Sequence, residues 1–169
     1  MKVRASNALT AFILLASLAV PAMAQQGAQL VFGAGATAVF RHNEHVQDTV
    51  ALLSAEYRSG RELFGQVKPL AGAFATSDGG AYVHAGLYRD FTLSSRWTFT
   101  PHFSAGIHEH GSKIDLGDPP EFQTGLDLFY RLPDGWREGV TLRHVSNGGS
   151  GSFNPGIETV ALLLSVPLR

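Results

Sequence analysis

The sequence predicts an all-β fold, an eight-stranded antiparallel up-and-down transmembrane β-barrel. Two observations lead to this prediction: apolar and polar residues alternate with period two rather than with a helical period, and turn residues interrupt the alternation at short intervals. Eight such segments can be counted, and an even number of strands is typical of bacterial membrane barrels. They cover residues 29–40, 48–58, 63–75, 81–90, 96–108, 121–132, 136–146 and 157–168.

The first 24 residues have the features of a secretory signal peptide. Lys2 and Arg4 precede an apolar run, and Ala22-Met23-Ala24 offers a small-residue cleavage site. The run is shorter than the about 20 apolar residues that a membrane-spanning helix requires. We therefore expect residues 1–24 to be removed as a signal peptide and residues 25–169 to form one outer-membrane β-barrel domain.

The composition limits how such a chain can be stabilised. Hydrophobic residues make up 44% of the chain and charged residues 16%, which suits one compact domain. There is no cysteine, so disulfides cannot hold an exported chain together, and a core, lipid or closure of a sheet must do so. The formal net charge is −1 without a basic stripe, which argues against a nucleic-acid partner.

Two kinds of eight-stranded barrel fit the strand count, a soluble lipocalin-type barrel with an apolar interior and a membrane barrel with an apolar exterior. One face of the predicted strands carries too many charges for a ligand cavity but suits a packed polar interior: Glu56, Arg58, Gln66, Lys68, His84, His102, Asp127 and Arg143. We expect Arg143 to pair there with Asp127 or Glu56. Trp97 and Trp136 follow two turns, as an aromatic girdle requires. The membrane barrel is therefore favoured, with a secreted soluble β-sandwich as the alternative.

Three polar residues interrupt the apolar face near the end of the chain. By parity, His144 and Ser146 share the apolar face of segment 136–146, and Glu158 begins the apolar face of the next segment. Polar groups in an apolar medium cost free energy unless they bond one another. Residues two apart on a strand lie about 6.5 Å apart and point the same way. His144 can thus reach Ser146, and Glu158 can accept from the other imidazole nitrogen.

That arrangement has the nucleophile, base and orienting acid of a serine hydrolase. The alternative interpretation is that the three are ordinary polar residues near a loop. Two further histidine-containing stretches, RHNEH at 41–45 and His108-Glu109-His110, are interpreted as exposed loop residues rather than as metal ligands.

The run RHVSNGG, followed by NPGIE, resembles the carboxy-terminal signature of the outer-membrane lipid A 3-O-deacylases (PagL), an Arg-His-x-Ser-Asn run followed by an Asn-Pro-Gly-like turn and a glutamate. His144, Ser146 and Glu158 match the family's catalytic residues in type, order and spacing, and Asn147 matches the asparagine beside the serine. Upstream, the resemblance rests on size, signal peptide and strand pattern. Arg169 is a departure, because outer-membrane barrels typically end in an aromatic residue.

The resemblance implies a serine esterase that hydrolyses the acyl ester at position 3 of lipid A, with a lipid-facing site toward the outer leaflet of a Gram-negative outer membrane. Ser146 would attack the ester, His144 would take its proton and Glu158 would orient the imidazole. Asn147 and Gly148 would form the oxyanion hole. Lipopolysaccharide would be the substrate, and neither a metal nor an organic cofactor is required. A homodimer stays open, because a partner barrel could mask or shape the site.

Two other functions remain as alternatives. A non-enzymatic barrel acting as an anchor or adhesin would be expected to have long, sticky outer loops, whereas the loops here are predicted to be short apart from residues 109–120. A soluble periplasmic lipid carrier would fractionate without detergent.

Overall fold

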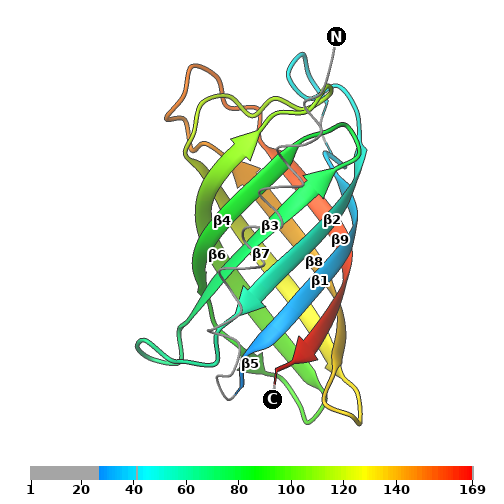
Figure 1. Cartoon of the computed structure of the whole chain (residues 1–169), viewed down its shortest axis with the longest axis vertical. Helices are drawn as coiled ribbons and strands as arrows, with labels where there is room; N and C mark the ends of the chain where they lie inside the picture. Colours follow the sequence, from blue (N-terminus) through cyan, green and yellow to red (C-terminus); the bar gives the residue numbers. More distant parts are fainter. Residues whose placement is uncertain (1–26, 41, 169) are drawn as a thin grey trace.

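The computed structural model describes residues 27–40 and 42–168, which form a closed antiparallel barrel (Figure 1). The predicted signal peptide and Arg169 lie outside the described residues. The barrel wall consists of β1 (Gln29–Thr37), β2 (Val50–Arg58), β3 (Lys68–Thr76), β4 (Ala81–Tyr88), β6 (Trp97–Glu109), β7 (Glu121–Arg131), β8 (Arg137–Ser146) and β9 (Ile157–Pro167), and a short strand, β5 (Phe91–Thr92), pairs with β6. No helix among the described residues is long and apolar enough to cross a membrane.

The strands pair with their neighbours in chain order, and the sheet closes on itself. The order is β4-β3-β2-β1-β9-β8-β7-β6, and β4 also pairs with β6. The predicted eight-stranded up-and-down topology is confirmed. We call the end with residues 38–49, 77–80, 110–120 and 147–156 the loop end (top of Figure 1), and the end with residues 59–67, 89–96 and 132–136 the turn end.

Two strand boundaries differ from the prediction for local reasons. β1 ends at Thr37 because Ala38 adopts a left-handed backbone, with φ of 58°. β3 begins at Lys68 because the chain folds back in a tight turn, where Phe64 bridges Val67 and Gln66 has φ of 68°. Gln66 is therefore exposed in a turn, and its prediction as an interior residue was wrong.

Burial alternates along the strands with the predicted period of two. In β6 the residues Thr98, Thr100, His102 and Ser104 are buried, whereas outward apolar residues of the wall are well exposed. Phe103 is 50% exposed and Leu162 is 70% exposed. An apolar exterior around a polar interior is the inverse of a lipocalin-type barrel and is the pattern of a membrane barrel.

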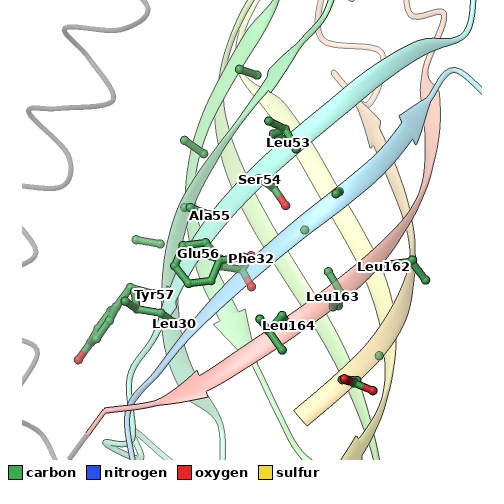
Figure 2. Close-up of a pocket in the computed structure, with 18 residues that line it drawn as sticks. Leu30, Phe32, Leu53, Ser54, Ala55, Glu56, Tyr57, Leu162, Leu163 and Leu164 are labelled. Carbon is green, nitrogen blue, oxygen red and sulfur yellow. The ribbon is translucent and has the colours of Figure 1, made fainter. Parts of the chain in front are cut away.

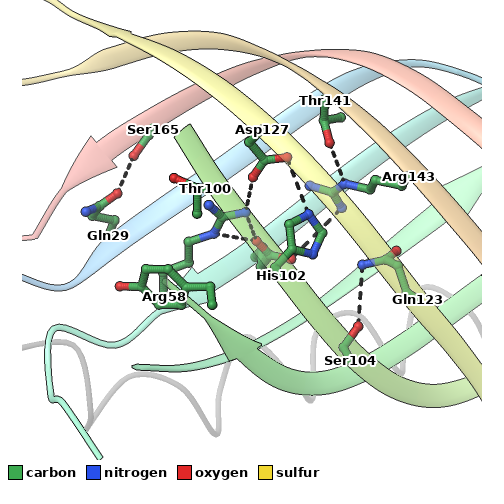
Figure 3. Close-up of polar contacts among 12 residues, drawn as sticks. Gln29, Arg58, Thr100, His102, Ser104, Gln123, Asp127, Thr141, Arg143 and Ser165 are labelled. Carbon is green, nitrogen blue, oxygen red and sulfur yellow. Dashed lines mark hydrogen bonds and ion pairs between the residues drawn. The ribbon is translucent and has the colours of Figure 1, made fainter. Parts of the chain in front are cut away.

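The interior is held together around one arginine (Figure 3). Arg58 is fully buried; its Nη2 donates to Asp127 Oδ2 at 2.6 Å, and its Nε donates to Glu56 Oε1 at 2.6 Å. The guanidinium carbon also lies 5.3 Å from the ring centre of Tyr88 and 5.7 Å from that of Phe129. The buried Arg58 guanidinium thus neutralises two carboxylates that have no access to bulk water.

Other polar side chains extend this network along the barrel. Arg143 Nη1 lies 4.0 Å from Glu56 Oε2, which confirms one of its two predicted partners. His84 Nε2 lies 3.9 Å from the same carboxylate, and His102 Nε2 lies 3.4 Å from Asp127 Oδ1. Side chains from β2, β4, β6, β7 and β8 therefore meet in a single charged layer.

At the loop end, long loops fold inward and cap the barrel. Val46 and Ile114 form a bridge between loops 38–49 and 110–120, and the Gln47 N–H donates to the Lys113 carbonyl at 2.9 Å. Val46 and Ile114 belong to a buried apolar cluster that joins these loops to the ends of the strands. Its members are Ala38, Val46, Val50, Leu52, Phe74, Tyr82, Ile114, Leu116, Val145 and Ile157. Loop 38–49 is as long as loop 110–120, contrary to the prediction, but both pack against each other over the interior.

Asp78, in the tight turn between β3 and β4, ties this cap to the wall. Its carboxylate accepts hydrogen bonds from Thr76 Oγ1 at 2.5 Å, from the Lys113 N–H at 3.0 Å and from the Ile114 N–H at 3.2 Å. Partial burial raises the pKa of Asp78, but these hydrogen bonds and one from the Gly80 N–H outweigh it, so that the pKa lies below its ordinary value.

Removing the central cation should destabilise the barrel. In Arg58→Gln two carboxylates lose their compensating charge, and we expect the free energy of unfolding to fall by about 3–5 kcal/mol. Urea titration of the protein folded in lipid vesicles measures this change. Lys113→Gln is the matched control, because it breaks an exposed pair with Asp48 (3.3 Å) and should cost less than about 1 kcal/mol. Equal effects of the two substitutions would contradict the central role of Arg58.

The cap should loosen in acid through Asp78. Because the pKa of Asp78 is lowered on folding, its contribution is complete above the ordinary value of 3.8 and is lost as the pH falls through the lower folded-state value. Hydrogen exchange at the Lys113 and Ile114 amides should therefore lose protection in that acid range. Asp78→Asn should lose this protection already at neutral pH, whereas the exposed Asp48→Asn should retain it.

Candidate active site

Adjacent strands β8 and β9 bring His144, Ser146 and Glu158 together at the loop end. His144 lies directly opposite Glu158 in the β8–β9 ladder, and Ser146 is the next residue of β8 on the same outward face. The His144 side chain is 46% exposed and that of Glu158 is 17% exposed. The three side chains therefore lie on the lipid-facing surface of the barrel rather than in its interior, in accordance with their predicted parity.

The Glu158 carboxylate lies beside one nitrogen of the His144 imidazole. His144 Nδ1 lies 3.4 Å from Glu158 Oε1, which leaves Nε2 for a second partner. The backbone of Glu158 is itself anchored, since its carbonyl accepts from the Val39 N–H at 3.3 Å and from Thr37 Oγ1 at 3.4 Å. The acid is thus held by β1 as well as by its own strand.

Gly156 provides the space in which the imidazole and the serine approach each other. A Cβ atom at position 156 would lie 2.8 Å from His144 Cε1, 3.4 Å from His144 Nε2 and 3.7 Å from Ser146 Cβ. The Nε2 edge of the ring and the serine thus border the same small volume, although no hydrogen bond joins them within the described residues. Catalytic hydrogen bonds often tighten only when substrate is bound. The NPG stretch was predicted only as a turn, and its contact with the imidazole was not predicted.

Asn147 fixes the loop that follows the serine. Its Nδ2 donates to the carbonyls of Leu116 (3.2 Å) and Phe153 (2.7 Å), and its backbone N–H donates to Asn154 Oδ1 at 3.2 Å. Asn147 is fully buried and connects loop 147–156 to loop 110–120. Of the two predicted oxyanion groups, only Gly148 has a backbone N–H without a partner in the described part of the chain. The contacts of Asn147 with Leu116 and Asn154 were not predicted from the sequence.

An aromatic surface lies on the other side of the serine. Phe122 is directly opposite Ser146 in the β7–β8 ladder and stacks on Phe103 of β6, with ring centres 6.1 Å apart. Because both rings are on the outward face, Ser146 lies between an acid–base pair and an apolar platform. The position of these two rings beside the serine was not predicted from the sequence.

A groove of about 950 Å³ lies at the wall, lined by outward apolar residues such as Leu162 and also by inward ones such as Glu56 (Figure 2). Its labelled lining residues come from β1, β2 and β9, and Leu162 and Leu164 belong to the strand that carries Glu158. Several of its lining residues are small alanines: Ala34, Ala55, Ala71, Ala73 and Ala75. The groove thus shares strand β9 with the candidate site.

The remaining histidines give no candidate metal centre. Within residues 27–40 and 42–168, no group of three or more His, Cys, Asp or Glu side chains could hold a metal ion. His110 is exposed, as predicted, but the interpretation of His108 as an exposed loop residue was wrong. It belongs to β6 and is half-buried, with its ring centre 6.5 Å from that of Phe74.

Comparisons with solved structures agree on the fold. The chain is similar to the crystal structure of the outer membrane enzyme PagL, with a TM-score of 0.60 and 16% identity over 82% of this chain and 99% of that chain. It is also similar to the crystal structure of Neisserial surface protein A (NspA), with a TM-score of 0.55 and 10% identity over 83% and 95% of the two chains. A structure from de novo design of transmembrane β-barrels has a TM-score of 0.50, with 11% identity over 83% and 95%.

The sequence comparisons identify the family. A search of curated proteins finds no significant match. The family model for lipid A 3-O-deacylase (PagL) matches residues 51–167, which include every residue of the candidate site. Since that match spans well over half of the chain and the fold agrees with it, this chain belongs to the lipid A 3-O-deacylase (PagL) family and is an outer-membrane β-barrel protein.

Proposed function

We propose that this protein is a serine esterase that hydrolyses the acyl ester at position 3 of lipid A, with its site toward the outer leaflet of the outer membrane. The observation that carries the proposal is the His144–Glu158 pair on the lipid-facing wall, with Ser146 on the same face. The match to the lipid A 3-O-deacylase (PagL) family supports the substrate class.

In the proposed reaction Ser146 Oγ attacks the ester carbonyl while His144 Nε2 takes the hydroxyl proton. Glu158 accepts a hydrogen bond from Nδ1–H and stabilises the imidazolium. Collapse of the tetrahedral intermediate breaks the ester C–O bond, and His144 returns the proton to the sugar oxygen. Water, deprotonated by His144, then hydrolyses the acyl-serine and releases the fatty acid.

The oxyanion is assigned to loop 147–156. The Gly148 N–H is the available donor, and a donor of this kind typically contributes about 3 kcal/mol to transition-state stabilisation. Asn147, whose own N–H groups are engaged, acts by holding the loop that presents Gly148. The three catalytic residues belong to one chain, so the proposed site requires no partner barrel.

The position of the site on the wall suits a membrane lipid. An ester at the boundary between head group and acyl chain lies at the level of the loop end, so the substrate need not leave the bilayer. The acyl chain would then extend along the outward residues below Glu158, toward the groove lined by Leu162 and Leu164. Phe122 provides a second apolar surface beside the ester.

Mass spectrometry of lipid A incubated with the refolded protein tests the proposal. The unsubstituted chain should release one hydroxyacyl group from position 3, and Ser146→Ala and His144→Ala should each reduce the rate by roughly 10³-fold or more. Glu158→Ala should reduce it by about 10²–10⁴-fold through loss of imidazole orientation. Ser112→Ala is the control, because Ser112 is an exposed loop serine. Unchanged lipid A from a folded barrel, or full activity of Ser146→Ala, would refute the proposal.

Substitution of Gly156 should lower the catalytic rate by displacing the His144 imidazole rather than by straining the backbone. In Gly156→Ala the added methyl group must displace the His144 ring, and we expect kcat to fall by about 10²-fold with KM almost unchanged. Gly149→Ala is a matched control, since Gly149 also has a left-handed backbone (φ 81°, against 61° at Gly156) but a Cβ there meets nothing within 4 Å. Equal losses in the two variants would show that backbone strain, not the position of the ring, is responsible.

A further inference from the structure

A cluster of cationic and aromatic residues lies at the turn end, opposite to the candidate site. Trp97 of β6 is directly across from Tyr130 of β7, and their rings meet edge to face with centres 5.1 Å apart. Arg96 directly precedes β6, and its carbonyl accepts a hydrogen bond at 2.8 Å from the N–H of Arg131, the last residue of β7. Arg96 is exposed, and Trp97 is 42% exposed on the outward face.

The Arg96 side chain is held by Tyr130. Arg96 Nη1 donates to Tyr130 Oη at 2.5 Å, and the guanidinium carbon lies 5.8 Å from the centre of the Tyr130 ring. A guanidinium group has five N–H donors, so this contact fixes its position and leaves most donors free. The arrangement presents a planar cation beside Trp97 at the level of the aromatic girdle.

No acid forms an ion pair with Arg96 within the described part of the chain, where the ion pairs join other residues. Glu138 lies opposite Tyr130 in the β7–β8 ladder, yet it too forms none of these pairs. The charge of Arg96 is therefore available to an additional anion.

We propose that Arg96, Trp97 and Tyr130 form a binding site for the phosphate of an anionic phospholipid at the turn end of the barrel. Tryptophan and tyrosine of a girdle lie at the depth where head groups meet acyl chains. The planar guanidinium fork matches phosphate oxygens, and each cation near an anionic membrane surface adds attraction. The site shares no residue with the catalytic machinery, and its existence does not depend on the proposed esterase activity.

Trp97 fluorescence can report the lipid beside the cluster. The full barrel carrying Trp136→Phe, which leaves Trp97 as the tryptophan of the folded domain, is refolded into phosphatidylcholine vesicles. Increasing fractions of brominated phosphatidylglycerol or brominated phosphatidylcholine are then compared as quenchers. We expect the anionic quencher to be preferred about fivefold, with a smaller preference at high salt. Equal quenching by the two lipids would overturn the proposal without any further variant.

Substitutions distinguish lipid binding at this cluster from a diffuse electrostatic attraction between the barrel and anionic lipids. Arg96→Gln should abolish most of the preference, and Tyr130→Phe, which keeps the charge but removes the hydroxyl group that holds Arg96, should reduce it partly. Arg61→Gln is the matched control, because Arg61 is an exposed turn-end arginine outside the cluster. Heat-modified mobility in electrophoresis verifies that each variant has folded. An equal loss in Arg61→Gln would show a diffuse charge effect and overturn the assignment to this cluster.

Discussion

Closure of the sheet is the constraint on which the rest of this molecule depends. In hydrocarbon an unpaired strand edge has no water to bond, so a sheet can cross the membrane only as a closed barrel. Here β1 pairs with β9 and β4 pairs with β6, which leaves none of the eight wall strands with a free edge. Closure also extends the alternation of inward and outward side chains around the whole barrel, because each wall residue then faces either the interior or the lipid. Polar residues that face outward, such as His144 and Glu158, consequently need a partner or a function.

The same alternation explains why the interior of the barrel is charged. The charges excluded from the lipid face must compensate one another inside, and Arg58 does so by bonding Asp127 and Glu56 from the centre of the barrel. The loop cap closes the space above, so that β8 and β9 are supported from within by the charged layer and at their ends by packed loops. Asn147 couples the cap to the serine through the Leu116 carbonyl. A reactive group can therefore be held rigidly on an exposed wall.

Much of this architecture follows from local sequence pattern. Period-two alternation was sufficient for the strand number, for most boundaries and for the partnership of Arg143 with Glu56, because these depend on neighbours along or across adjacent strands. The position of Glu158 opposite His144 follows from the same parity and a short connecting loop. The contacts of Asp78 with Lys113, of Asn147 with Leu116 and of Gly156 with the imidazole do not. They depend on how separate loops pack in space, which composition and periodicity do not specify.

The two ends of the barrel differ in how boundary charges are balanced. At the loop end Glu158 lies beside His144, so in the proposed reaction the acid would stabilise the imidazolium that forms when His144 takes the serine proton. At the turn end Arg96 is bonded to a neutral tyrosine, and its charge remains available to an external anion. A compensated pair suits catalysis because it retains its own geometry when lipids exchange around it. An uncompensated guanidinium suits binding because its interaction is completed only by the head group. Under the two proposals the same wall would process one lipid and hold another.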